Sequence, residues 1–273
     1  MKILSTLHNH CTMCDGRSSP EEMISAASAA GFTDFGMSCH GYAPFDPAYS
    51  IPGEEEYLTA MAGLRNACSG RLRLYTGIEE DLFAPSAMPE RYDYRIGDVH
   101  YARDRSTGEF VPVDGSVEDL LHVIRSLFHG NAMDMVRDYY ANMVTASEKR
   151  PLVLGHFDLI TKYNERGRFF DEDSDEYRDL ALQALEACLA SGAVFEINSG
   201  AAAKGLRSVP YPAPFLLRRL RELGGSVTLS ADCHYAPYLT AGLDLGVQSA
   251  RDAGFDEILQ FIDGRFVPFS LCD

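Results

Sequence analysis

The chain has 273 residues, of which 46% are hydrophobic and 23% charged, a composition typical of a globular protein with one large core. Its formal net charge of −16 argues against a surface for extended nucleic acids or anionic membranes, because such surfaces need clustered Lys and Arg. No run approaches the ~18 apolar residues of a membrane span, and the N-terminal segment is too polar for a signal peptide. The seven cysteines follow no framework spacing, so we expect a cytoplasmic protein with reduced thiols.

The predicted elements alternate between short apolar strands and amphipathic helices. The first helix carries its own boundary signals, because Ser19 can act as N-cap, Pro20 takes the first helical position and Gly31 can close the last turn. In chain order we predict a strand at 3–8, a helix at 19–31, a strand at 32–38, a helix at 54–67, strands at 73–78 and 93–100, a helical segment at 116–149, a strand at 151–156, a helix at 175–192, a strand at 193–198, a helix at 213–225 and a strand at 226–232.

This order of elements predicts an α/β barrel. About seven strands, each mostly followed by a helix, indicate parallel βαβ units, and seven or eight such units usually close into a barrel. The segment 116–149 is much longer than a normal βα connection, so it is interpreted as a helical insertion in a single domain spanning 1–273. In such barrels the active site gathers at the C-terminal ends of the strands.

Histidines and carboxylates stand at these predicted strand ends. Residues i and i+2 of a strand face the same side, so His8 and His10 can bind one ion, and Asp232 and His234 repeat the spacing. Glu79 follows an apolar strand and can bridge two ions. Six of the eight histidines lie at a strand end, which chance placement would not produce: His8, His10, His40, His100, His156 and His234.

The remaining histidines and the cysteine pair are given structural interpretations. His122 and His129 lie in the long helical segment, away from any strand end. Cys11 and Cys14 form a CxxC pair, but zinc-ribbon chemistry needs a second pair and the chain has none. We therefore expect these cysteines to be bystanders of a metal site.

Read in order, the strand-end motifs resemble those of the PHP superfamily (polymerase and histidinol phosphatase), and within it the histidinol-phosphate phosphatases. The resemblance runs from residue 8 to residue 234 and implies a distorted (β/α)7 TIM-like barrel, a single PHP domain, with a trinuclear metal centre at the C-terminal ends of the strands. The motifs that carry it are HNHCTMCDG, SCHGYAP, GIEED, IGDVHY, GHFDLITKY, FEINSG and SADCH.

The resemblance also implies a ligand set for each ion. The sequence departs from the family pattern at two places: Cys39 precedes His40 where the family usually has Asp, and AAAKGLR lengthens the segment after the sixth strand. One ion would take His8, His10, Glu79 and Asp232; a second would take Glu79, His100 and His156; the third would take Asp15, His40 and His234.

The chemistry implied is phosphate-ester hydrolysis by a metal-bridging hydroxide. Imidazole and carboxylate ligands together suit Mn, Fe or Zn, so three divalent ions of these kinds, in some mixture, are expected as cofactors. When the negative charges of the carboxylate ligands and of one hydroxide are added to those of three divalent ions, a net charge of about +2 is left at the site. This charge attracts a phosphate dianion although the chain as a whole is acidic. Bound divalent ions can lower the pKa of water to roughly 7, which supplies the nucleophile.

Side chains for the substrate are predicted less sharply. Arg207 matches the position of the family's phosphate-binding arginine, and Lys204, Lys162 and Arg17 are further candidates. The proton donor to the leaving group stays open between a metal-bound water, Asp98 and Asp158.

The predicted activity is hydrolysis of L-histidinol phosphate to L-histidinol and phosphate, a step of histidine biosynthesis. The nearest alternative is a PHP-family phosphoesterase for a nucleotide or another small phosphate ester. A barrel amidohydrolase also begins with HxH, but it often bridges its metals with a carboxylated lysine, and TGIEED contains no lysine. A non-catalytic metal-binding domain would have lost ligands, and every expected ligand type is present. The oligomeric state stays open.

Overall fold

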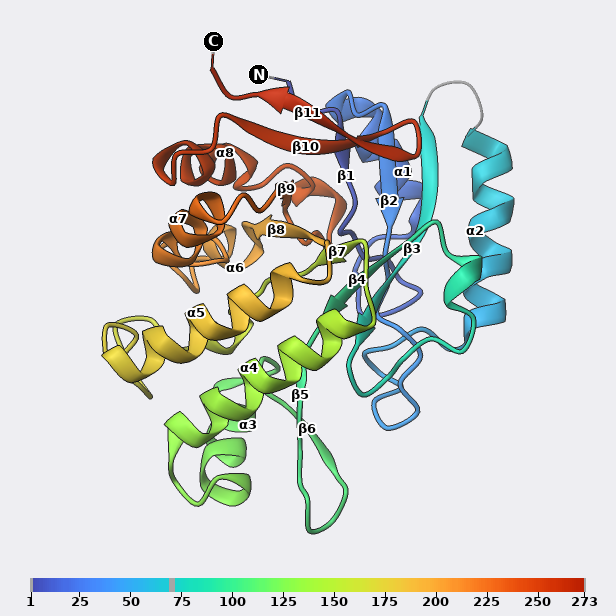
Figure 1. The fold of residues 1–273 in the computed structure, drawn as a ribbon. Helices are drawn as coiled ribbons and strands as arrows, with labels where there is room; N and C mark the ends of the chain where they lie inside the picture. The colour runs from blue at the N-terminus through green and yellow to red at the C-terminus, as the bar shows by residue number, and fades with distance from the viewer. Residues whose placement is uncertain (1, 69–71, 273) are drawn as a thin grey trace.

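The computed structural model describes residues 2–68 and 72–272, so residues 1, 69–71 and 273 of the predicted single domain lie outside the description. Seven strands pair in parallel to form one strongly curved sheet, with helices around it (Figure 1). In spatial order they are β1 (Ser5–Thr6), β2 (Asp34–Met37), β3 (Arg73–Asp81), β4 (Tyr94–Asp98), β7 (Val153–Leu154), β8 (Val194–Asn198) and β9 (Val227–Ser230). All seven predicted strands are confirmed, and the spatial order follows the chain order as a (β/α)7 barrel requires.

The sheet nearly closes where its first and last strands meet. Beyond β1, Asn9 pairs with Cys233 in a parallel bridge, and the backbone N–H of His10 donates to the carbonyl of Cys233 at 2.8 Å. These contacts bring the motifs that follow β1 and β9 side by side.

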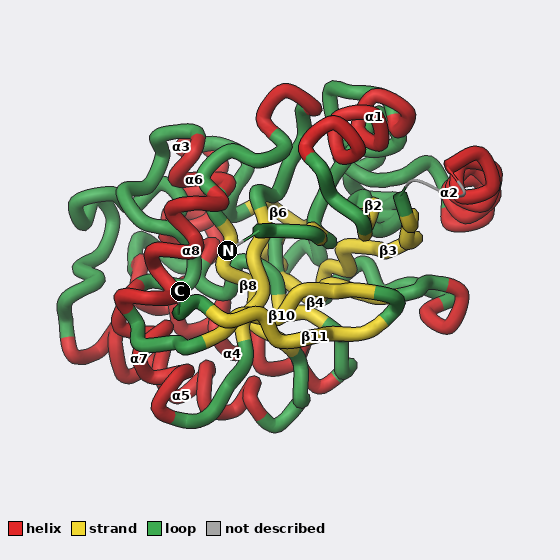
Figure 2. The backbone as a smooth tube through the Cα atoms, turned by 90° about the horizontal axis from the view of Figure 1, so that it is seen from above, coloured by secondary structure: helices red, strands yellow, loops and turns green. Residues whose placement is uncertain are grey.

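A C-terminal hairpin, absent from the predicted elements, covers the end of the barrel at which the strands begin. It consists of β10 (Glu257–Ile262) and β11 (Arg265–Ser270), which pair antiparallel. The N–H of Phe261 donates to Oγ of Ser5 at 2.8 Å, which ties the hairpin to β1. In Figure 2, seen from above, the hairpin lies in front of the barrel strands. The opposite end, where the strands terminate, is therefore the one open to ligands.

The helices around the barrel largely follow the predicted pattern. In α1 (Pro20–Ala30) the predicted caps are confirmed: Ser19 and Glu22 form a reciprocal capping box, and Gly31 ends the helix with φ 82°. The other helices of the barrel layer are α2 (Glu54–Cys68), α5 (Asp175–Leu189), α7 (Pro214–Glu222) and α8 (Leu243–Asp252), with short turns at η1 (Pro89–Arg91), η3 (Leu159–Thr161), α6 (Gly200–Ala203) and η4 (Ala236–Tyr238). Of these helices, α8 was not predicted.

The segment predicted as one helical insertion is divided in the structure. A hairpin of β5 (Tyr101–Arg103) and β6 (Phe110–Pro112) precedes it. The helical part then splits into α3 (Val117–His122), a π-helical turn η2 (Val123–Leu127) and α4 (Ala132–Glu148). The last of these, α4, packs on α5, where the hydroxyls of Tyr140 and Tyr177 lie 3.0 Å apart. It therefore serves as the outer helix between β4 and β7.

The interior of the barrel is apolar only at the hairpin end. The side chain of Tyr94 fills this end of the interior, because Gly36 in β2 and Gly77 in β3 leave room for its ring. Its hydroxyl donates to the carbonyl of Leu7. Leu7, Ile96, Val153 and Phe261 complete this small cluster with Tyr94. The open half of the interior is left to polar side chains. Among the described residues no helix is both long and apolar enough to cross a membrane.

Candidate metal centre

The polar half of the barrel holds the predicted ligands around one carboxylate, that of Glu79 in β3. Its Oε1 lies 3.0 Å from Nε2 of His8 and 2.9 Å from Nε2 of His156. Its Oε2 lies 3.2 Å from Nε2 of His10 and 2.8 Å from Nδ1 of His40. Because each oxygen faces different imidazoles, Glu79 has the geometry of a bridging ligand.

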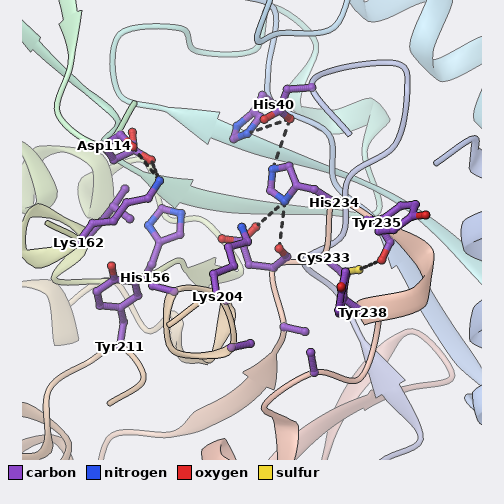
Figure 3. A pocket seen from close by; sticks show the side chains of 18 of the residues that line it. His40, Asp114, His156, Lys162, Lys204, Tyr211, Cys233, His234, Tyr235 and Tyr238 are labelled. Atoms are coloured by element: carbon purple, nitrogen blue, oxygen red, sulfur yellow. Dashed lines mark hydrogen bonds and ion pairs between the residues drawn. The ribbon is translucent and has the colours of Figure 1, made fainter. Parts of the chain in front are cut away.

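All nine predicted ligand side chains come together at the strand ends. They gather beside a cavity of about 640 Å³, and Figure 3 shows His40, His156 and His234 pointing into the same space. Three groups have ligand atoms within 4.8 Å of one another: His8, His10 and Asp232; Glu79, Asp98, His100 and His156; and His10, Asp15, His40 and His234.

These groups differ from the implied ligand sets in three ways. Glu79 falls in the group of His100 and not in the group of His8, for which it was also predicted. His10 belongs to two groups, since its Nδ1 lies 3.9 Å from Oδ1 of Asp15 and its Nε2 lies 3.3 Å from Oδ1 of Asp232. Asp98, predicted only as a proton donor, joins the group around Glu79, with Oδ1 at 3.2 Å from Nδ1 of His100.

The donor atoms fit bound metal ions. Several are buried and make no hydrogen bond within the described residues, which costs free energy unless a ligand compensates. They include Nε2 of His8, His10 and His40, Oδ1 of Asp15 and Asp232, and both carboxylate oxygens of Asp98.

The electrostatics of the cluster favour protons or metal ions on these atoms. Burial lowers the pKa of His8, but the charges of Glu196, Glu79 and Asp232 outweigh it and raise that pKa well above its usual range. Burial also lowers the pKa of His100, but the charges of Asp98 and Glu79 outweigh it and raise that pKa well above its usual range. Conversely, burial raises the pKa of Glu79, and the surrounding histidines pull it well below its usual range.

Glu196 and Asn198 of β8 contact the donor cluster, and the sequence interpretation gave them no role. Oε1 of Glu196 lies 2.7 Å from Nδ1 of His8, and its Oε2 accepts from the backbone N–H of His156 at 3.0 Å. The side-chain amide of Asn198 donates to Glu196 at 2.9 Å and to Asp232 at 3.3 Å. Their i, i+2 spacing after an apolar run repeats the His8–His10 signal, which is how they could have been found.

Asp98 and Asp158, the predicted side-chain proton donors, both lie behind the cavity wall. Burial raises the pKa of each to about 7. Asp98 contacts His100, and Oδ2 of Asp158 accepts from the N–H of Ala213 at 2.9 Å. Neither is among the residues that line the cavity in the described chain, so their role as acids stays a prediction.

The cationic candidates for phosphate divide into two kinds. Arg17, Lys162 and Lys204 line the cavity, and Nζ of Lys162 is held by the carboxylate of Asp114 at 2.9 Å (Figure 3). Arg207, the first choice from sequence, does not line it. The residue is 8% exposed, and its guanidinium donates to both carboxylate oxygens of Glu172, at 2.8 and 2.7 Å. In this structure the guanidinium is therefore engaged in a bidentate ion pair. Its contact with phosphate stays a prediction.

The cysteines lie beside the ligands. Sγ of Cys39 is 3.3 Å from Sγ of Cys11, and Sγ of Cys14 is 3.5 Å from Nδ1 of His10. Cys39 therefore faces another thiol, and the orientation of His40 depends on Glu79 instead.

Fold and site together define a metal-binding (β/α)7 barrel whose donor cluster lies at the C-terminal ends of its strands. The family model of the PHP domain matches residues 6–200, and the chain belongs to this family.

Three similar proteins are all named as histidinol phosphatases. A protein of Schizosaccharomyces pombe named as a histidinol-phosphatase is 25% identical over 257 residues, which cover 86% of this chain and 81% of that protein. A solved structure named as a histidinol phosphatase from Listeria monocytogenes has a TM-score of 0.72 at 17% identity, covering 88% of this chain and 98% of that one. The histidinol phosphate phosphatase of Lactococcus lactis, solved with Zn, L-histidinol and phosphate, has a TM-score of 0.69 at 19% identity, covering 96% and 98%. These two structures share the barrel fold.

Proposed function

We propose that the protein is a cytoplasmic, metal-dependent phosphomonoesterase that hydrolyses L-histidinol phosphate to L-histidinol and phosphate in histidine biosynthesis. The observation that carries this proposal is the gathering of the nine predicted ligand side chains, Glu79 among them, beside a cavity with cationic side chains on its wall. The names of the fungal and bacterial relatives support the choice of substrate.

The residues that would hold metal are those of the three groups, with His10 common to two of them. The carboxylate of Glu79 contacts histidines of all three groups and would bridge neighbouring ions. We infer three divalent ions, drawn from Mn, Fe and Zn, because mixed imidazole and carboxylate donors suit these metals. Divalent ions at such a site supply positive charge for the phosphoryl oxygens and a hydroxide-like nucleophile at neutral pH.

The side chains of this chain bind and orient the ester. Arg17, Lys162 and Lys204 bring positive charge to the cavity wall of an acidic protein and would contact the phosphoryl group. Burial raises the pKa of Asp98 and Asp158 to about 7, so either can hold the proton that the leaving alkoxide needs. Because neither side chain lines the cavity, that proton would pass through a water molecule or a side chain that does.

The test is kcat/KM for L-histidinol phosphate on manganese-loaded protein, compared with p-nitrophenyl phosphate, AMP and a phosphodiester. We expect a preference of at least about a hundredfold for L-histidinol phosphate, lost in His10→Ala and kept in His122→Ala, a histidine outside the donor cluster.

Other results would redirect the proposal. Weak and undiscriminating turnover of the esters would leave a phosphoesterase for a nucleotide or another small phosphate ester. Failure to hydrolyse any phosphate ester with metal bound would contradict phosphatase chemistry and point to a non-catalytic metal-binding domain or to an amidohydrolase.

A further inference from the structure

Tyr211 places a hydroxyl without a partner at the wall of the cavity. Its side chain is 3% exposed and lines the cavity, and its oxygen forms no hydrogen bond with any described residue. Figure 3 shows the hydroxyl directed toward the side of the cavity where His156 and Lys162 lie.

The backbone holds this ring in place. The N–H of Tyr211 donates to the carbonyl of Asn198 at 3.0 Å, and its own carbonyl accepts from the N–H of Asn198 at 2.8 Å. Asn198 ends β8 and its side chain contacts Asp232, so the tyrosine is tied to the same strand end as the donor cluster.

Every other buried tyrosine in the described chain has a partner for its hydroxyl. Tyr139, for example, donates to the carbonyl of Phe157 at 3.2 Å, and Tyr57 donates to that of Met37 at 2.9 Å. A buried hydroxyl left unpaired lowers stability, so such groups are rare and concentrate where a ligand binds.

The chemistry of the phenol suits an anion. Burial, with the charge of Asp158 next, raises the pKa of Tyr211 well above its usual range, so the hydroxyl keeps its proton. A phenol held neutral donates hydrogen bonds to oxygen readily but is a poor acid, which favours binding over proton transfer to a leaving group.

We propose that the hydroxyl of Tyr211 donates a hydrogen bond to a non-bridging oxygen of the phosphoryl group bound in the cavity, beside Lys162. Tyr211 is thus a substrate-contacting residue for phosphomonoesters. This inference rests on the proposed function.

The experiment compares Tyr211→Phe with wild type, both loaded with manganese. It measures inhibition by inorganic phosphate, kcat/KM for L-histidinol phosphate and p-nitrophenyl phosphate, and the melting temperature. Because hydrogen bonds to charged groups are strong, we expect phosphate affinity to fall by about 10- to 100-fold and kcat/KM for the two esters to fall by one common factor. The melting temperature should stay the same or rise, since the lost hydroxyl had no protein partner.

Tyr177→Phe is the matched control, because Tyr177 is equally buried but its hydroxyl pairs with that of Tyr140 away from the cavity. This variant should lower the melting temperature and leave phosphate affinity unchanged.

Each other outcome contradicts the inference in its own way. Wild-type phosphate affinity in Tyr211→Phe would overturn it while leaving the phosphatase intact. A larger loss for the alkyl ester than for the aryl ester would make the hydroxyl a proton donor instead. A melting temperature lowered as in Tyr177→Phe, with unchanged phosphate affinity, would make it structural. If wild type with metal bound neither binds phosphate nor hydrolyses an ester, the proposed function fails and this inference fails with it.

Discussion

The carboxylate of Glu196 lies 2.7 Å from Nδ1 of His8, and both side chains are fully buried. This contact directs Nδ1 of His8 toward Glu196 and Nε2 toward Glu79. Since the second oxygen of Glu196 accepts from the N–H of His156, one side chain of β8 orients ligands from two other strands.

Glu196→Gln should weaken metal binding by about 10- to 100-fold, because a neutral amide is a poorer partner for a metal-bound imidazole than a carboxylate. Competition with a chromophoric chelator measures the affinity. Glu186→Gln is the control, since Glu186 pairs with Arg219 on the surface, away from the donor cluster. Equal affinities in the two variants would show that Glu196 does not tune the site.

His10→Ala should remove more metal than His234→Ala. His10 belongs to two candidate groups and His234 to one, although their rings stack with centroids 3.9 Å apart. Elemental analysis of each purified variant gives metal equivalents per chain. Identical losses from both variants would contradict the assignment of His10 to two ions.

Metal affinity should rise with pH through neutrality. Burial lowers the pKa values of His8 and His100, but the neighbouring carboxylates outweigh it and raise both well above the usual range, so in the metal-free protein both imidazoles keep their protons to higher pH than a free histidine does. Metal must displace these protons, and its binding therefore becomes stronger as they are lost at higher pH. Calorimetry in buffers of different ionisation enthalpy counts the protons released at each pH. Binding without proton release near neutrality would refute the raised pKa values.

Gly77→Ala should destabilise the fold by about 1–3 kcal/mol or more, because a Cβ there would lie 2.1 Å from Cζ of Tyr94 in a packed interior. Gly63→Ala is the opposite control. Gly63 lies inside α2, and apart from its neighbours in the helix backbone no described atom lies within 4 Å of an added Cβ, so alanine should stabilise the helix by roughly 0.5–1 kcal/mol. Urea unfolding measures both, and a stable Gly77→Ala protein would mean that Tyr94 can leave the barrel interior.

Strand ends were the most predictable part of the site. His8 and His10 follow β1 at i, i+2 spacing and His40 follows β2, and parallel strands deliver the residues that follow them to one end of the barrel. The caps of α1 were readable for a similar reason, since Ser19 and Gly31 act on the backbone beside them.

Contacts between residues distant along the chain were not predictable in this way. Arg207 follows a family motif, yet its guanidinium pairs with Glu172, which comes from a different connection. The C-terminal hairpin carries a local signal that the sequence interpretation did not use, the Asp263-Gly264 turn between two apolar runs. Its attachment to Ser5, at the opposite end of the sequence, was not predictable from such a signal.

The sequence by itself determined the barrel order, the strand-end positions of the candidate ligands and the ends of α1, because these depend on local periodicity and on the rule that parallel strands share an end. Only the tertiary structure decided which ligands share an oxygen of Glu79, that Glu196 orients His8, and that the hydroxyl of Tyr211 stands alone at the cavity wall. The physical reason is that a hydrogen bond or a shared ligand depends on distances of about 3 Å between strands, and those distances are set by packing rather than by spacing along the chain.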